Sequence, residues 1–306
     1  MTELFLHHFD LSPFAEKARL MLGLKRLAWR SVQIPIIMPK PDFTVLTGGY
    51  RKTPALQIGA DVYCDTRLIA AELERRYPSP TLFPGGSRGL ALALAAWSDR
   101  AFFEPGAGLS MGTNRQGLPQ AVIDDRKAFF NFMDFDHLGD DLLHLTTQLR
   151  AHADLVNEQL ADGRSYLLGT EPSLADIHAY FPLWMTRANV AAAASLLEPF
   201  RYLKPWEARV KALGHGTRSE ATASDAHAAA RSATPAPGRG VDPADALGLA
   251  SGERVTVTPD DYGRVPVEGE LVTLELHEVA VRRADPRVGT VVVHFPRIGY
   301  RVERAA

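Results

Sequence analysis

The sequence has one cysteine, little net charge and no long apolar run, and each shortage narrows what the protein can do. With Cys64 as its single cysteine, the chain cannot form an internal disulfide, a Cys-x-x-Cys redox pair or a zinc–thiolate cluster. Its formal net charge of −2 creates no bulk field that would attract nucleic acid or an acidic membrane. We therefore expect no metal site, no nucleic-acid partner and no membrane partner.

The N-terminus and the apolar segments give no sign of export or membrane insertion. The chain starts Met-Thr-Glu and enters a short apolar stretch that two histidines interrupt, without the basic start and long apolar core of a signal peptide. The longest apolar stretches, such as residues 90–97, are far shorter than a membrane span. A single cysteine also fits a reducing compartment. We expect a soluble, cytoplasmic protein.

The first 84 residues alternate between strand and helix patterns. Strand-like runs at 2–9 and 29–34 flank a helical pattern at 12–24, which has Pro13 in its first turn, where proline is well placed. After a loop rich in proline and glycine, a hairpin at 54–65 leads into a helix at 66–77 that Pro78 and Pro80 end. This β-α-β-β-α order predicts a thioredoxin-like domain over residues 1–84.

The hairpin carries the most informative residues of the chain. Pro54 begins its first strand, a position that tolerates proline, and an X-Pro bond there can be cis. Asp65 and Thr66 follow its second strand at the point where a helix begins. A carboxylate, a hydroxyl and the N–H groups of a helix start together suit a small polar ligand.

Together with the stretch Ser12-Pro13-Phe14 after the first strand, the hairpin resembles that of the glutathione transferase family. The resemblance covers residues 1 to about 214. It implies a thioredoxin-like glutathione-binding domain at 1–84 and an all-helical domain at 85–215. It also implies an enzyme that uses glutathione as co-substrate against a small-molecule electrophile and that forms a homodimer.

The resemblance assigns the sulfur of glutathione to Ser12. The family's theta-, beta- and omega-like branches have a catalytic serine or cysteine at the start of this helix, and serine there argues against mixed-disulfide chemistry. The competing interpretation of Ser12 is a plain helix cap before Pro13. The tyrosine that other branches use is absent, and His8 stands near its position. Cys64 lies beside the site within a strand and is interpreted as a small buried apolar residue.

The resemblance assigns the rest of glutathione to the hairpin. The backbone of Thr53, before an expected cis Pro54, would pair with the cysteinyl part. Asp65 and Thr66 would hold the γ-glutamyl end, although either residue also suits a helix cap. The glycyl carboxylate would be neutralised by Lys52 or by the neighbouring Arg51, both of which are equally suited to a solvated surface.

The middle of the chain is helical. Apolar spacing predicts helices at 89–103, 118–135, 140–160, 173–194 and 205–213. The fourth opens with Ser173 followed by Asp176, a variant of the capping box that serves the fold and not the chemistry. Aromatic residues that line either the core or a second-substrate pocket are Phe102, Phe103, Phe129, Phe130, Phe132 and Trp184.

The last third of the chain lies outside the resemblance. Residues 216–250 are rich in Ala, Pro and Gly and predict a linker, with an exposed helix possible at 219–231. Five strand-like runs between 251 and 306 predict a small β-barrel-like module. That module has nine acidic residues and eight arginines, whereas a nucleic-acid-binding barrel is more often strongly basic. The fold class expected overall is α+β and multi-domain.

Three functions remain open from the sequence. The first is a glutathione transferase-like enzyme that promotes attack of the bound thiolate on an unknown electrophile. The second is a non-catalytic protein of the same fold whose β-module contacts a partner. The third is a thiol-independent enzyme that uses His7 or His8.

Overall fold

The computed structural model describes residues 3–305, so Thr2, at the start of the first expected strand, lies outside the described residues. Backbone contacts divide the chain into two compact units. The sheet unit contains residues 3–15, 28–72 and 217–305, and the helical unit contains residues 16–27 and 73–216. Among the described residues, no helix is long and apolar enough to cross a membrane.

The sheet unit starts with the predicted thioredoxin-like order. Its β1 pairs in parallel with β2 and antiparallel with β3, and β3 pairs antiparallel with β4. Two of the helices, α1 and α3, begin in this unit and continue into the helical unit. The elements are β1 (Phe5–His8), α1 (Pro13–Leu24), β2 (Ala28–Gln33), α2 (Pro41–Thr47), β3 (Ala55–Ile58), β4 (Asp61–Cys64) and α3 (Thr66–Arg76).

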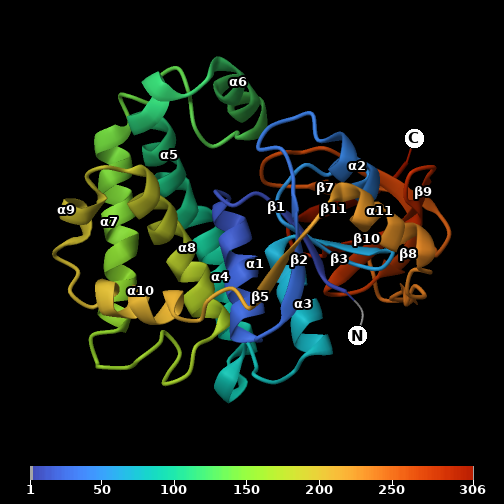
Figure 1. The fold of residues 1–306 in the computed structure, drawn as a ribbon, viewed down its shortest axis with the longest axis horizontal. Helices are drawn as coiled ribbons and strands as arrows, with labels where there is room; N and C mark the ends of the chain where they lie inside the picture. The colour runs from blue at the N-terminus through green and yellow to red at the C-terminus, as the bar shows by residue number, and fades with distance from the viewer. Residues whose placement is uncertain (1–2, 306) are drawn as a thin grey trace. The chain divides into compact units, whose positions relative to one another are not determined.

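The five strands predicted after residue 251 are present, and they extend the N-terminal sheet. The strand order is β11-β7-β8-β9-β10-β4-β3-β1-β2-β5, with β6 paired to β8, and the late strands appear in orange and red in Figure 1. Their junction with the early strands is the parallel pairing of β10 with β4. The module is therefore an open part of one sheet and not a closed barrel. The strands are β7 (Arg254–Pro259), β8 (Val267–Leu274), β9 (Glu278–Asp285), β10 (Gly289–Pro296) and β11 (Tyr300–Arg304).

The expected linker contains regular structure that its composition concealed. β5 (Thr217–Ala221) pairs in parallel with β2 at the far edge of the sheet, and β6 (Gly240–Val241) pairs with β8. The expected helix is present as α11 (Ala223–Ser232), but it is not an exposed one, because Ala226, His227 and Ala230 are buried. Ala226 packs against Phe5 of β1 and Val32 of β2. Small alanine side chains let this helix approach the sheet closely.

The helical unit contains the helices that the sequence predicts and two that it did not, the short α9 and the longer α5. The sequence of α5, FEPGAGLSMGTN, is poor in helix formers. A Cβ at Gly106 would lie 3.1 Å from Met185, and one at Gly108 would lie 2.7 Å from Leu145, so the glycines permit close helix packing. The helices are α4 (Arg88–Trp97), α5 (Phe103–Asn114), α6 (Gln120–Phe129), α7 (Leu142–Gln159), α8 (Leu174–Asn189), α9 (Ala193–Leu197) and α10 (Leu203–Lys211), with a π-helical turn at Ser98–Phe102.

Two predictions for this unit have clear outcomes. The expected helix at 118–135 ends at Phe129, where the backbone of Phe130 becomes extended. Further along, Asp134 accepts the N–H of Asp136 at 2.9 Å, and such side-chain turns compete with helix. The predicted capping box of α8 is confirmed, since Ser173 and Asp176 cap each other's N–H groups. Asp176 also accepts the indole N–H of Trp206 at 2.9 Å, which ties α10 to the start of α8.

Candidate functional site

The register of the sheet brings the predicted glutathione-binding residues to one end of three strands. His7 of β1 is paired with Ala55 of β3, which in turn is paired with Cys64 of β4. The chain therefore leaves β1 toward Ser12, enters β3 from Pro54 and leaves β4 toward Asp65 at the same end of the sheet. Residues that stand far apart in the sequence share this end because β3 runs opposite to its two neighbours.

Ser12 lies directly before α1 and is only 3% exposed. Its Oγ accepts the N–H of Ala15 at 3.2 Å, so the hydroxyl caps the helix. Accepting this bond uses a lone pair and leaves the hydroxyl hydrogen able to donate. The helix start also favours negative charge. Capping and donation to a thiolate are thus compatible at Ser12.

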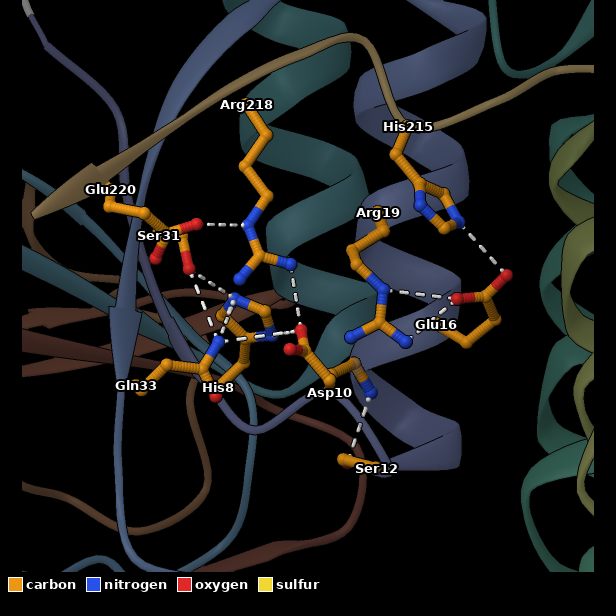
Figure 2. A network of polar contacts seen from close by, with 11 residues as sticks. His8, Asp10, Ser12, Glu16, Arg19, Ser31, Gln33, His215, Arg218 and Glu220 are labelled. Atoms are coloured by element: carbon orange, nitrogen blue, oxygen red, sulfur yellow. Dashed lines mark hydrogen bonds and ion pairs between the residues drawn. The ribbon is translucent and has the colours of Figure 1, made fainter.

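The loop before Ser12 is held by a strand that the sequence did not predict. Arg218 of β5 donates to Asp10 at 2.8 Å and to Glu220 at 2.7 Å (Figure 2). Burial alone would raise the pKa of Asp10, but the bond and the charge of Arg218 lower it. Gln33 also donates to Asp10 at 3.3 Å. The ion pair fixes the backbone two residues ahead of Ser12.

Asp65 and Thr66 form the junction between β4 and α3. Asp65 has a φ of 73°, a left-handed conformation that is uncommon for a residue other than glycine and that concentrates at functional sites. Its carboxylate accepts the backbone N–H of Arg67 at 2.9 Å and the Arg67 guanidinium at 3.1 Å. Thr66 is buried. The carboxylate therefore caps α3 and also faces a cation of its own chain.

Thr53 and Pro54 are joined by a cis peptide bond, as the sequence analysis expected. Next to them lies Lys40, a residue that the sequence analysis did not single out. Its ammonium group donates to the Thr53 Oγ1 at 3.3 Å and to the Arg51 carbonyl at 3.2 Å. Lys40 is only 3% exposed, so a buried cation supports the strand entrance where the cysteinyl part of glutathione was expected.

Lys52 points toward the C-terminal strands. Its ammonium group donates to the carboxylate of Asp261 and lies 4.2 Å from the ring centre of Tyr262. Burial lowers the pKa of Lys52, and the charge of Asp261 offsets only part of that shift. The cation expected to meet a glycyl carboxylate is thus already paired with a carboxylate of this chain.

The two histidines of β1 belong to the core of the sheet. His7 and His8 point to opposite faces, as successive strand residues do, and both are buried. His7 bonds to Gln57 at 2.8 Å, and burial lowers its pKa to about 4. His8 bonds to Ser31 at 3.0 Å. These contacts give both rings a role in the fold and weaken the thiol-independent interpretation. Cys64, as expected, is buried.

The aromatic residues expected in the core or in a pocket differ in burial within the helical unit. Phe102 and Phe103 are buried, and Phe103 stacks on Phe181 at 5.8 Å. Phe132 lies 6.0 Å from Phe103 at the edge of this cluster and is half-buried, as are Phe129, Phe130 and Trp184.

Two family profiles match the chain. A profile described as Glutathione S-transferase, N-terminal domain matches residues 6–81, and one described as Glutathione S-transferase, C-terminal domain matches residues 114–209. Together the matches span more than half of the chain. The chain belongs to the glutathione S-transferase family. The N-terminal match contains all six of the predicted site residues.

Solved structures and a curated protein extend this glutathione S-transferase assignment. The crystal structure of a GST-like protein from Pseudomonas syringae is 39% identical, with a TM-score of 0.83 and 100% of each chain covered. FtsZ-localized protein A of Caulobacter vibrioides (strain NA1000 / CB15N) is 28% identical over 187 residues, 57% of this chain and 73% of that protein. The structure of FzlA from C. crescentus is 26% identical, with a TM-score of 0.51, and the match covers 68% of this chain and 88% of that one. Because the Pseudomonas match spans the whole length, it includes the C-terminal strands.

The sequence analysis missed the residues that reach the site from outside the glutathione S-transferase domains. Asp261 and Tyr262 contact Lys52, and the Tyr300 hydroxyl lies 3.3 Å from the Asp65 carboxylate. The sequence contains a weak signal for the first contact, since Asp260 and Asp261 follow a strand and precede a glycine turn. Nothing in the sequence indicates that this turn meets Lys52.

Proposed function

We propose that the protein is a glutathione transferase-like enzyme that binds glutathione and promotes attack of its thiolate on an electrophilic carbon. The observation that carries the proposal is the strand register, which brings Ser12, Thr53-Pro54 and Asp65-Thr66 to one end of the sheet. In this arrangement Ser12 faces the sulfur, the Thr53 backbone pairs with the cysteinyl part, and Asp65 and Thr66 hold the γ-glutamyl end. Lys52 belongs to the glycyl end. The second substrate is a small-molecule electrophile.

Ser12 would act by favouring the thiolate. A free thiol has a pKa near 8.5 and is only a few per cent ionised at neutral pH. Lowering that pKa by about two units raises the ionised fraction roughly 25-fold, but the intrinsic nucleophilicity falls with a slope of about 0.45, so the net gain is a few-fold. Holding the electrophile over the sulfur must therefore supply more of the rate enhancement.

A second candidate function is a non-catalytic binding protein of this fold. The observation in its favour is the similarity to a protein named FtsZ-localized protein A, a name that describes location and not catalysis. In this case the C-terminal strands would contact a partner protein. The cap that Ser12 provides to α1 would then be its whole role.

Substitution of Ser12 distinguishes the enzyme from the non-catalytic binding protein. Ser12→Ala should retain glutathione within a few-fold, raise the pKa of the bound thiol and lower kcat/KM by about tenfold. Ser12→Thr, which keeps a hydroxyl, is the matched control and should restore the thiol pKa. The measurements are the ultraviolet absorbance of the thiolate during a pH titration and initial rates with a panel of electrophiles.

Two results would decide against the enzyme. One is glutathione retention by the wild type without turnover of any electrophile, which would favour the binding protein. The other is an equal thiol pKa in the wild type and in Ser12→Ala. We further propose that the enzyme acts as a homodimer, which light scattering of the full chain tests directly.

A further inference from the structure

Two loops of the C-terminal strands reach the same end of the sheet as the proposed glutathione site. β10 runs parallel to β4, with His294 beside Tyr63, so the turn after β10 lies next to the turn after β4. β11 begins at Tyr300, which is paired with Pro259 at the end of β7. The loop that follows β7 therefore also arrives at this end, and it carries Asp261 and Tyr262.

The turn between β10 and β11 contacts the expected γ-glutamyl end of the site. The Tyr300 hydroxyl donates to the Asp65 carboxylate at 3.3 Å, and Arg67 donates to the Ile298 carbonyl at 3.2 Å. Tyr300 is buried, and its hydroxyl lies 3.0 Å from that of Tyr50. These contacts position Asp65 and Arg67 and leave the γ-glutamyl end with one anion and one cation.

The loop after β7 contacts the expected glycyl end of the site. Its Asp261 brings a negative charge next to Lys52. The side chain of Lys52 is 13% exposed and that of Asp261 is 26% exposed, and the two form an ion pair. The ring of Tyr262 covers the same ammonium group. Lys40, a further cation at this end, is bonded to the Thr53 hydroxyl and the Arg51 carbonyl, so it already supports the strand entrance.

We propose that Asp261 determines the specificity of the site by taking the place on Lys52 that a glycyl carboxylate would take. The inference rests on the proposed function. Two carboxylates on one half-buried ammonium repel each other, and this repulsion is strong where water is partly excluded. The preferred ligand is therefore a γ-glutamyl-cysteinyl thiol whose C-terminal end carries no charge. Glutathione itself binds only by displacing Asp261.

The test compares glutathione with its glycyl monoethyl ester, which differs only in that end. Titration calorimetry with the wild-type full chain should show the ester binding about tenfold more tightly than glutathione. Asp261→Asn, which keeps the shape and removes the charge, should raise the affinity for glutathione about tenfold and leave that for the ester within twofold. Asp260→Asn removes the same charge one residue earlier and should change neither affinity.

The possible outcomes distinguish failure of this inference from failure of the proposed function on which it rests. If neither peptide binds the wild type or either variant, the proposed function fails and the inference fails with it. If glutathione binds the wild type at least as tightly as the ester does, only the inference is overturned. An equal gain in glutathione affinity in Asp261→Asn and Asp260→Asn would also overturn it, because the effect would then come from the net charge of the protein and not from the position of Asp261. The wild-type comparison stands even if a variant does not fold.

Discussion

At the scale of single residues, His294 forms a polar link between the early strand β4 and the late strands β9 and β10. Its Nδ1 lies 2.7 Å from Glu278 and its Nε2 lies 3.0 Å from Asp61, while its ring stacks on Tyr63 at 4.5 Å. Burial alone would lower the pKa of His294, but the bonds to the two carboxylates raise it above 6.5. Burial alone would raise the pKa of Glu278, but His294 and Arg239 lower it below 4.5.

These opposite pKa shifts predict a pH range in which the protein is most stable. A raised histidine pKa gives stability that is full below pH 6.5 and is lost as the pH rises through the folded-state value. A lowered glutamate pKa gives stability that is present above pH 4.5 and is lost as the pH falls through the folded-state value. His294→Gln should therefore cost about 1–3 kcal/mol near pH 5.5 and clearly less near pH 9, as measured by urea unfolding.

The exposed His144 provides the control for this experiment. His144→Gln should leave the free energy of unfolding nearly unchanged at both pH values. A cost of His294→Gln that is the same at pH 5.5 and pH 9 would contradict the ionic role of this histidine. It would then act only through packing and hydrogen bonds.

The sequence predicted residues of the site only where a local motif carries them. Asp65 and Thr66 could be proposed because a hairpin and a helix start are local patterns, and the cis peptide before Pro54 was expected because the hairpin resembles that of the glutathione transferase family. Lys40 and Asp261 were not found, because their roles depend on contacts with Thr53 and Lys52. Such contacts follow from the sheet order, which no local pattern specifies.

At the scale of elements, glycines determine where helices can approach other segments. Gly23 lies in α1, and a Cβ at this position would come 1.9 Å from the backbone oxygen of Gly214. The missing side chain lets the chain after α10 pass directly over α1. Gly106 and Gly108 have the same role in α5, which explains why a helix stands where the composition argued against one.

The close approach of the Gly214 backbone to Gly23 in α1 gives a prediction at this scale. Gly23→Ala should destabilise the protein by at least about 1–3 kcal/mol, since a backbone oxygen cannot move aside as a flexible side chain can. Gly89 in α4 has no atom within 4 Å of its Cβ position, so Gly89→Ala should be neutral or stabilise by up to about 1 kcal/mol. Thermal melting of the two variants measures the difference. Equal melting temperatures would show that α1 and the crossing segment can separate freely.

At the scale of the whole molecule, one core joins the N-terminal residues of the sheet unit to the C-terminal strands. Phe43, Leu46 and Val62 are buried in the same cluster as Val281 and Phe295. The sequence predicted the strands after residue 251 from their apolar pattern, but their shared core with the N-terminal residues could not be predicted. The β10–β4 pairing depends on segments at opposite ends of the chain.

Because the core is shared, we expect that the chain cannot fold stably without its last strands. Removal of residues 251–306 would expose β4 as an unpaired edge and uncover the N-terminal half of this core. A fully buried Val, Leu or Phe contributes about 1.5–3 kcal/mol, and a protein of this size has roughly 5–15 kcal/mol in all. The fragment 1–250 should therefore aggregate or lose its cooperative thermal transition, as measured by calorimetry and light scattering.

Co-expression supplies the control, because it restores the core without the covalent link. The fragments 1–250 and 251–306 produced together should copurify, since the strands of one complete the sheet of the other. A fragment 1–250 that melts cooperatively near the temperature of the full chain would contradict the prediction. It would mean that the family's two domains fold alone and that the C-terminal strands dock on a finished surface, in which case Asp261 could reach Lys52 only after folding is complete.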